Sequence, residues 1–210
     1  PPPHHLVRRQ RQMCIRDRVY SIKNNYHPFL IDKHINRLIQ SAKLLYIEEI
    51  PDKNTIKEDI KLLINSKSDF QDYYLKYLLC YLDEGSWSRH DKPDRVCFLY
   101  PVESIFREKT LKSCNASITS IQRINQNSMP PKIKCGANYI NSRLGYLEVN
   151  KRGQNNLPIM PIFLDNRGYI SESSGSCIFV IKDKSISTPP LKSSILPSIT
   201  RSVSYTHLRA

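Results

Sequence analysis

The spacing of apolar residues changes several times along the chain, and this change restricts the fold class more than any other feature. From Asp32 to Ile47 they recur every three or four positions, which predicts an amphipathic helix with Asp32 as its N-cap and an apolar stripe of Ile35, Leu38, Ile39, Ala42 and Leu45. A second helical pattern begins at Thr55, with Ile56, Ile60 and Leu63. The aromatic and aliphatic runs that begin at Tyr73 and Val96 favour strands.

The second half of the chain shows the same mixture. Prolines in NSMPPK, which begins at Asn127, mark a loop, and a helix is predicted from about Ala137 to Arg152 with Gly153 at its stop position. Residues 113–121 are a weaker strand candidate, and short strands are predicted in PIFLD, YISE, CIFVIKD and SIST. With a composition break at residues 104–112, this predicts an α/β protein with a small N-terminal lobe and the start of a larger one.

The two ends of the chain differ from the rest. Residues 1–18 carry five arginines and one aspartate, and their RQRQMCIRDR part, like SVSYTHLRA at residues 202–210, resembles translated sequencing-adapter sequence. We therefore predict non-native tails at 1–18 and 202–210 and exclude them from reasoning about the fold. Much of the net charge of +13 lies in these tails. A basic arm that binds nucleic acid is the competing interpretation, but charge blocks are usually solvated surface, so no nucleic-acid partner is expected.

The cysteines and the apolar runs exclude several classes of protein. The six cysteines form no C-x-x-C pair and have no histidine at zinc-ligand spacing, so neither a disulfide framework nor a metal site is expected. The most apolar run, from Tyr77 to Leu82, is far shorter than the roughly 20 residues of a membrane helix. No membrane partner is expected, and the predicted location is cytoplasmic.

Lys134 is the candidate for a reactive amine. It lies in PPKIKCGANY, between the Pro-marked loop and a helix whose start bears the small residues Gly136 and Ala137. Reactive groups are commonly presented at such junctions of elements. A lysine that forms a Schiff base needs an amine that is partly neutral, which desolvation and neighbouring cations achieve. Lys132 and Arg143 are cations that lie near it in the sequence.

Four blocks of sequence resemble one family in the order that the family has them. KCGANYINSRLGYLE, YISESSGSCIFVIKD and STPPLKSSILPSITR resemble three signatures of the pyridoxal-phosphate-dependent class IV aminotransferases, the branched-chain type of fold type IV. HINRLIQSAKLL resembles the helix that binds the cofactor phosphate in that family. The resemblance implies a two-domain α/β fold, with a small domain at residues 19–107 and a large cofactor-binding domain that begins at 108 and is cut short after 201. It also implies pyridoxal 5′-phosphate as the cofactor.

The resemblance assigns three residues to the cofactor ring. Lys134 matches the lysine that binds the cofactor covalently and then moves the proton between substrate Cα and cofactor C4′. The alternative is an ordinary surface lysine. Tyr139 matches the tyrosine that hydrogen-bonds the phenolic oxygen, the alternative being a tyrosine packed on the core. Glu172 matches the acid that keeps the pyridine nitrogen protonated, so that the ring acts as an electron sink. Its alternative is an exposed glutamate at a strand end.

Further residues match the phosphate and substrate sites. Arg37 matches the arginine whose guanidinium binds the phosphate. The alternative is an exposed arginine on the polar face of its helix. Ile199 and Thr200 match the helix start whose N–H groups receive the same phosphate, the alternative being an ordinary threonine cap. Tyr74 and Lys76 lie where the family has a tyrosine and an arginine in the substrate pocket, and a plain half-buried strand explains them nearly as well.

The chain departs from the family pattern at several positions. Lys76 replaces an arginine, which weakens the expectation of bidentate carboxylate binding there. Ser198 stands in place of a glycine before the Ile-Thr pair, and Cys177 in place of an asparagine. After Arg201 the pattern stops, so the remainder of the large domain is expected to be missing. The fragment itself is then expected to be poorly stable and to bind cofactor weakly.

The function that the resemblance implies is transamination between an L-amino acid, most often branched-chain, and a 2-oxo acid such as 2-oxoglutarate. D-amino-acid transamination and aminodeoxychorismate lyase chemistry use the same lysine and stay open as alternatives. A catalytically incompetent fragment or pseudoenzyme is a further alternative, against which the joint presence of the matched residues argues. A homodimer is expected for the full-length protein.

Overall fold

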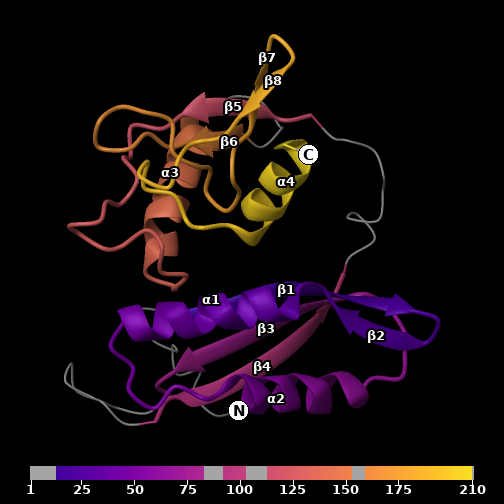
Figure 1. Ribbon diagram of the computed structural model, residues 1–210. Coiled ribbons are helices and arrows are strands. Elements are labelled where there is room, and N and C mark those ends of the chain that lie inside the picture. The colour runs from indigo at the N-terminus through magenta and orange to yellow at the C-terminus, as the bar shows by residue number, and fades with distance from the viewer. Residues whose placement is uncertain (1–12, 83–91, 103–112, 153–158, 210) are drawn as a thin grey trace. The chain divides into compact units, whose positions relative to one another are not determined.

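The computed structural model describes residues 13–82, 92–102, 113–152 and 159–209. The chain divides into two units (Figure 1), unit 1 with residues 1–110 and 134–136 and unit 2 with residues 111–133 and 137–210. The predicted domain boundary after residue 107 and the predicted helix stop at Gly153 lie outside the described residues.

Unit 1 is built on an antiparallel sheet with the strand order β2-β1-β3-β4. The strands are β1 (Met13–Ile22), β2 (Asn25–Pro28), β3 (Tyr73–Cys80) and β4 (Asp94–Pro101). Lys23 and Asn24 connect β1 to β2 with φ of 47° and 58°. Positive φ at both residues of a two-residue turn matches the right-handed twist of the strands it joins.

The structure places parts of both predicted tails inside regular elements. Residues 13–18 form the first part of β1, where Met13 pairs with Leu79 and Arg18 with Tyr74 of β3. Residues 202–209 belong to helix α4 (Ile199–Arg209). A strand needs only main-chain partners along one edge, so an irregular side-chain pattern does not prevent its formation. The predicted non-native origin of these residues stays a prediction.

Two helices cover one face of this sheet. Helix α1 (Ile31–Leu44) contacts β1, helix α2 (Lys53–Asn65) contacts β4, and the two helices touch each other (Figure 1). The buried residues of the two helices and alternate residues of β3 make up the core of this unit, which contains Ile35, Leu38, Ala42, Ile56, Ile60, Ile64, Tyr73, Leu75, Tyr77 and Leu79. The helical periods in the sequence therefore identify the correct buried faces.

The predicted cap of α1 is wrong. The N-cap is Leu30, which has φ of 51° and makes no side-chain cap hydrogen bond. Asp32 lies instead in the first turn, where a carboxylate interacts favourably with the helix dipole, and its Oδ1 is 2.6 Å from Lys57 Nζ. Helix α2 begins two residues before Thr55, because Asp52 caps it by accepting a hydrogen bond from the Thr55 N–H at 2.8 Å.

Unit 2 contains two small sheets and two helices. Strands β5 (Asn115–Ile118) and β6 (Ile159–Ile162) pair in parallel, and helix α3 (Asn138–Arg152) contacts β6 (Figure 1). Strands β7 (Val180–Lys182) and β8 (Ser185–Ser187) form a hairpin. Of the strand predicted at PIFLD, the structure forms only the first two residues, at the end of β6. A single bridge between Leu164 and Ile170 replaces the rest of it and the strand predicted at YISE, around a turn at Gly168 with φ of 82°.

Gly145 of α3 permits a close approach to Phe163, whose side chain is fully buried. A Cβ at position 145 would lie 2.4 Å and 2.6 Å from two atoms of the Phe163 ring. We expect Gly145→Ala to lower the free energy of unfolding by about 1–3 kcal/mol, as overpacked cores do. Urea unfolding measures this effect, and Leu144→Ala at the exposed neighbouring position is the matched control. Restoration of stability by a second change, Phe163→Leu, would assign the loss to this contact.

Candidate functional site

Helix α1 carries three polar residues on one side, His34, Arg37 and Ser41, at positions i, i+3 and i+7. His34 and Ser41 are buried, with exposed fractions of 8% and 1%. The backbone N–H of Lys134 donates a hydrogen bond to Ser41 Oγ at 3.1 Å across 93 positions of sequence. The segment 134–136 accordingly belongs to unit 1. The fold thus joins the backbone of Lys134 to the helix that carries Arg37, and both are predicted cofactor residues.

Burial and the charges of Arg37 and Lys134 all lower the pKa of the His34 imidazole. Burial is the first cause that lowers the pKa of His34 to about 4, followed by the positive charges of Arg37 and Lys134. Arg37 Nη2 is 3.5 Å from His34 Nδ1. On β1, Asp17 Oδ1 is 3.4 Å from His34 Nε2. Burial raises the pKa of Asp17 to about 7, against the hydrogen bond from the Arg18 N–H and the charge of Arg37. A neutral imidazole therefore lies between the carboxyl group and the guanidinium.

The pH dependence of stability tests this pair. The lowered pKa of His34 stabilises the fold above pH 6.5, and that contribution is lost as the pH falls toward about 4. The raised pKa of Asp17 acts in the opposite direction, because the fold retains its proton from pH 3.8 up to about 7. The two slopes oppose each other between about pH 4 and 6.5, so the pair contributes little net pH dependence to the unsubstituted chain.

Asp17→Asn removes the contribution of Asp17 to the pH dependence of stability. The urea midpoint of this variant is expected to fall as the pH is lowered from 6.5 to about 4, because only the contribution of His34 remains. Urea titrations at several pH values across this window provide the measurement. A variant whose midpoint follows that of the unsubstituted chain would contradict the neutral state of His34.

Tyr74 and Lys76 lie on the other face of the sheet. They alternate along β3 with the buried residues Tyr73, Leu75 and Tyr77, and Tyr77 marks the helix side because its hydroxyl donates to Asp59 Oδ2 of α2 at 2.6 Å. The Arg18 guanidinium lies 5.6 Å from the centre of the Tyr74 ring, and Lys76 is opposite Phe98 of β4. The sheet therefore separates Tyr74 and Lys76 from the contact between Asp17 and His34. Their role in a substrate pocket stays a prediction.

Glu172 is buried in unit 2, with an exposed fraction of 7%, so it is not an exposed glutamate at a strand end. Glu172 Oε1 is 2.7 Å from Arg123 Nη2, and Glu172 Oε2 accepts a hydrogen bond from the Leu196 N–H at 3.0 Å. The neighbours Ser171 and Ser173 are also buried, and their hydroxyl oxygens have no hydrogen-bond partner within the described part of the chain. The carboxylate is therefore fixed from two sides and flanked by polar groups.

Arg123 is the functional candidate that the sequence did not reveal. It is 6% exposed, and its Nη1 donates to Asn141 Oδ1 at 3.2 Å and to Ser142 Oγ at 3.1 Å. Its guanidinium also lies 5.9 Å from the centre of the Phe163 ring. In the sequence it is one arginine between the weak strand candidate at residues 113–121 and the Pro-marked loop. No motif marks it there, because its partner is 49 positions away.

Tyr139 and the start of α4 are the other predicted residues in unit 2. Tyr139 is 38% exposed in the first turn of α3, so it is not packed on the core. Ile199 and Thr200 begin α4, where Ser198 Oγ accepts a hydrogen bond from the Arg201 N–H at 3.2 Å. The cap of this helix is therefore Ser198 and not Thr200. Unpaired N–H groups and the dipole at a helix start suit an anion.

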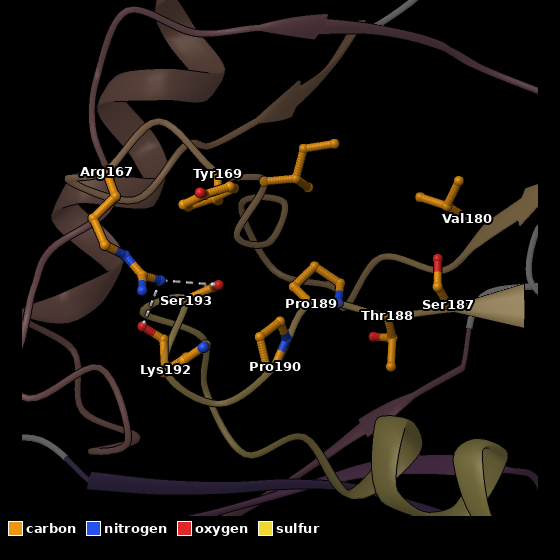
Figure 2. Close-up of a pocket in the computed structure, with 10 residues that line it drawn as sticks. Arg167, Tyr169, Val180, Ser187, Thr188, Pro189, Pro190, Lys192 and Ser193 are labelled. Atoms are coloured by element: carbon orange, nitrogen blue, oxygen red, sulfur yellow. Dashed lines mark hydrogen bonds between the residues drawn. The ribbon is translucent and has the colours of Figure 1, made fainter.

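A further hollow in unit 2 contains none of the predicted site residues. Its volume is about 550 Å³, and Figure 2 shows Pro189, Pro190 and Tyr169 among its lining. Arg167 donates to the Lys192 carbonyl oxygen at 3.3 Å and pairs with Asp165 at 2.6 Å. In the described residues no group of three His, Cys, Asp or Glu side chains could hold a metal ion. Among the same residues, no helix is long and apolar enough to cross a membrane.

Comparison with known proteins identifies the family. The model of the family "Amino-transferase class IV" matches residues 18–210. This chain belongs to the class IV aminotransferases. The family predicted from the four sequence blocks is thereby confirmed, and with it the assignment to the pyridoxal-phosphate-dependent aminotransferases.

Several class IV relatives are similar over most of this chain. The putative branched-chain-amino-acid aminotransferase of Methanocaldococcus jannaschii is 30% identical over 178 residues, which are 83% of this chain and 59% of the relative. The branched-chain-amino-acid aminotransferase of Escherichia coli K12 is 30% identical over 173 residues, which are 80% of this chain and 54% of the relative. The chain thus spans little more than half the length of these curated relatives.

Solved structures of class IV aminotransferases confirm the predicted fold class. The branched-chain amino acid aminotransferase of Thermobaculum terrenum in its PLP form has a TM-score of 0.83 at 28% identity, covering 98% of this chain and 67% of that one. A structure of the Escherichia coli enzyme has the same TM-score at 25% identity and the same coverage. The mixed α/β lobes predicted from the sequence are those of this family.

The residues present fit the cofactor of the class IV family, pyridoxal 5′-phosphate, which the Thermobaculum structure contains. Unit 1 offers the amine of Lys134 and the guanidinium of Arg37, both of which act on His34. Unit 2 offers the Glu172 carboxylate, held by Arg123, between two buried serine hydroxyls that lack a partner in the described residues. An amine, a cation for a phosphate and an acceptor for a ring N–H are the groups that this cofactor needs.

Proposed function

We propose that the protein to which this chain belongs transfers the amino group of a branched-chain L-amino acid to a 2-oxo acid such as 2-oxoglutarate, with pyridoxal 5′-phosphate as cofactor. The observation that carries this proposal is the hydrogen bond from the Lys134 N–H to Ser41 Oγ. It joins the predicted covalent anchor to the helix that bears Arg37, the predicted phosphate ligand. The branched-chain substrate follows the names of the Methanocaldococcus and Escherichia relatives.

Each site residue has a distinct role in this proposal. Lys134 Nζ would hold the cofactor and would move the proton at the substrate Cα. Arg37 offsets the charge of the phosphate, and the first N–H groups of α4, at Ile199 and Thr200, bind the same group. Tyr139 donates to the phenolic oxygen. The bound cofactor supplies an electron sink for the carbanion at Cα.

Glu172 and Arg123 form the part of the proposal that concerns the ring nitrogen. The Arg123 cation at 2.7 Å favours the ionised form of the Glu172 carboxylate. An ionised carboxylate accepts a hydrogen bond from a protonated ring nitrogen and so favours that protonation state. Arg123 therefore acts on the ring through Glu172, as a positioning residue.

Tyr74 and Lys76 would bind the substrate carboxylate or side chain. Lys76 presents a single ammonium where the family has a planar arginine fork, so we expect weaker selection for a second carboxylate. A homodimer and a cytoplasmic location complete the proposal on the basis of the family resemblance.

A panel of amino donors tests the proposed reaction. The full-length protein loaded with cofactor should accept L-leucine, L-isoleucine and L-valine with 2-oxoglutarate as acceptor. Turnover of D-alanine alone would favour the D-amino-acid alternative, and release of pyruvate from aminodeoxychorismate would favour the lyase. Failure with every donor would favour the pseudoenzyme.

The role of Arg37 gives a prediction about binding. Arg37→Ala is expected to weaken the affinity for pyridoxal phosphate about 10- to 100-fold, because a charge-assisted hydrogen bond contributes about 1.5–3 kcal/mol. Affinity for pyridoxal, which lacks the phosphate, should not change. Titration followed by cofactor absorbance measures both ligands. Lys33→Ala, which removes an exposed charge from the same helix, is the matched control, and an equal loss for both ligands would contradict the role of Arg37.

A further inference from the structure

Ser41 is a polar residue on the buried side of helix α1. It is 1% exposed inside α1, next to Ala42 and near Leu38, which are both part of the core. A buried hydroxyl costs free energy unless it is hydrogen-bonded. Helical serines commonly bond a backbone carbonyl of their own helix. Ser41 Oγ accepts a hydrogen bond from a remote segment, donated by the N–H of Lys134.

The segment around Lys134 is held on both sides. Ile133 and Cys135 are buried, with exposed fractions of 2% and 0%, so the backbone at Lys134 lies inside the protein. A backbone N–H in such a place requires an acceptor. Asn138 Nδ2 donates to the Ile133 carbonyl oxygen at 2.8 Å, which is the acceptor of the peptide group between Ile133 and Lys134. The Ser41 hydroxyl accepts from the donor of the same peptide group, the N–H of Lys134, at 3.1 Å.

The charge of Lys134 also acts on the same helix. The positive charge of Lys134 contributes to the lowered pKa of His34, two turns before Ser41 on α1. The backbone contact is therefore made at Ser41, while the ammonium acts on the helix at His34. Arg37 lies between these two positions in the sequence.

We infer that Ser41 is a positioning residue for Lys134. Its hydroxyl fixes the backbone from which the reactive amine extends, so that one helix sets both the phosphate cation Arg37 and the covalent anchor. This inference rests on the proposed function and assigns to Ser41 a role that the sequence motifs did not. A fixed separation between the two groups lets a cofactor bound at its phosphate present its reactive carbon to the amine without further ordering.

The experiment compares Ser41→Ala with two matched variants of the same helix. Ser41→Thr keeps a hydroxyl, and Ala42→Gly weakens the helix without removing an acceptor for Lys134. Each protein is incubated with pyridoxal phosphate and reduced with borohydride, and the label on Lys134 is compared with that on the exposed Lys132 by peptide mass spectrometry. Amide hydrogen exchange at Lys134 is measured on the same proteins without cofactor.

Ser41→Ala should lower the ratio of label on Lys134 to label on Lys132 at least about tenfold and accelerate exchange at the Lys134 amide, since a factor of ten corresponds to loss of one good hydrogen bond. Ser41→Thr should restore both, and Ala42→Gly should change neither. A Ser41→Ala protein with an unchanged ratio and unchanged exchange overturns the inference. So does an Ala42→Gly protein that loses both to the same extent. If the unsubstituted chain shows no preference for Lys134, the proposed function fails, and the exchange measurement alone decides the role of Ser41.

Discussion

Replacing Lys134 by alanine is expected to abolish covalent attachment of pyridoxal phosphate at the candidate site. In the unsubstituted chain, addition of the cofactor should produce the absorption band of a lysine adduct, and borohydride should fix the label on the peptide that contains Lys134. The fold supports a selective reaction, because the Lys134 N–H is anchored on Ser41 and the positive charge of Lys134 contributes to the lowered pKa of His34. In Lys134→Ala the band should be lost, and the label should fall to the background given by the other lysines.

Lys132 provides the control for this prediction. It is an exposed lysine two positions before Lys134 in the same segment. Lys132→Ala therefore removes an equal charge and leaves the anchored residue in place, so its absorption band should match that of the unsubstituted chain. An undiminished band in Lys134→Ala would exclude Lys134 as the covalent anchor, whatever the family resemblance implies.

Removing Arg123 is expected to have the largest effect on stability. Its guanidinium and the Glu172 carboxylate are 2.7 Å apart, with side-chain exposed fractions of 6% and 9%. Removal of one partner of a buried ion pair leaves the other charge without compensation and costs about 3–5 kcal/mol. Arg123→Met should lower the free energy of unfolding by that amount. Denaturant unfolding provides the number, and hydrogen exchange at the Phe163 amide shows whether the loss occurs in unit 2.

A second substitution separates the ion pair from the other contacts of Arg123. Arg123→Met combined with Glu172→Gln should be less destabilised than the sum of the two single variants, because neither buried charge remains. Arg143→Met, at an exposed position of α3, should change stability by no more than about 0.5 kcal/mol. Additive effects in the double variant would show that the pair at 2.7 Å contributes no coupling.

The fold class and the family can be predicted from the amino-acid sequence alone. A period near 3.6 predicted α1 and α2 with the correct buried faces, because the spacing of an apolar stripe is a local property of the sequence. Aromatic and aliphatic runs predicted β3 and β4. Four ordered blocks identified the class IV aminotransferases. The sequence could not give the cap of α1, since Leu30 adopts a positive φ that no local preference of leucine predicts.

Only the tertiary structure decided which residues support the predicted ones. Ser41 is 93 positions from Lys134, and Arg123 is 49 positions from Glu172, so no window of sequence contains either pair. The structure also removed three alternatives, an exposed strand-end position for Glu172, a core position for Tyr139 and a cap position for Thr200. Motifs name the groups that carry chemistry because those groups lie in short runs. The groups that hold them come from other elements, and hydrogen bonds formed on folding bring them together.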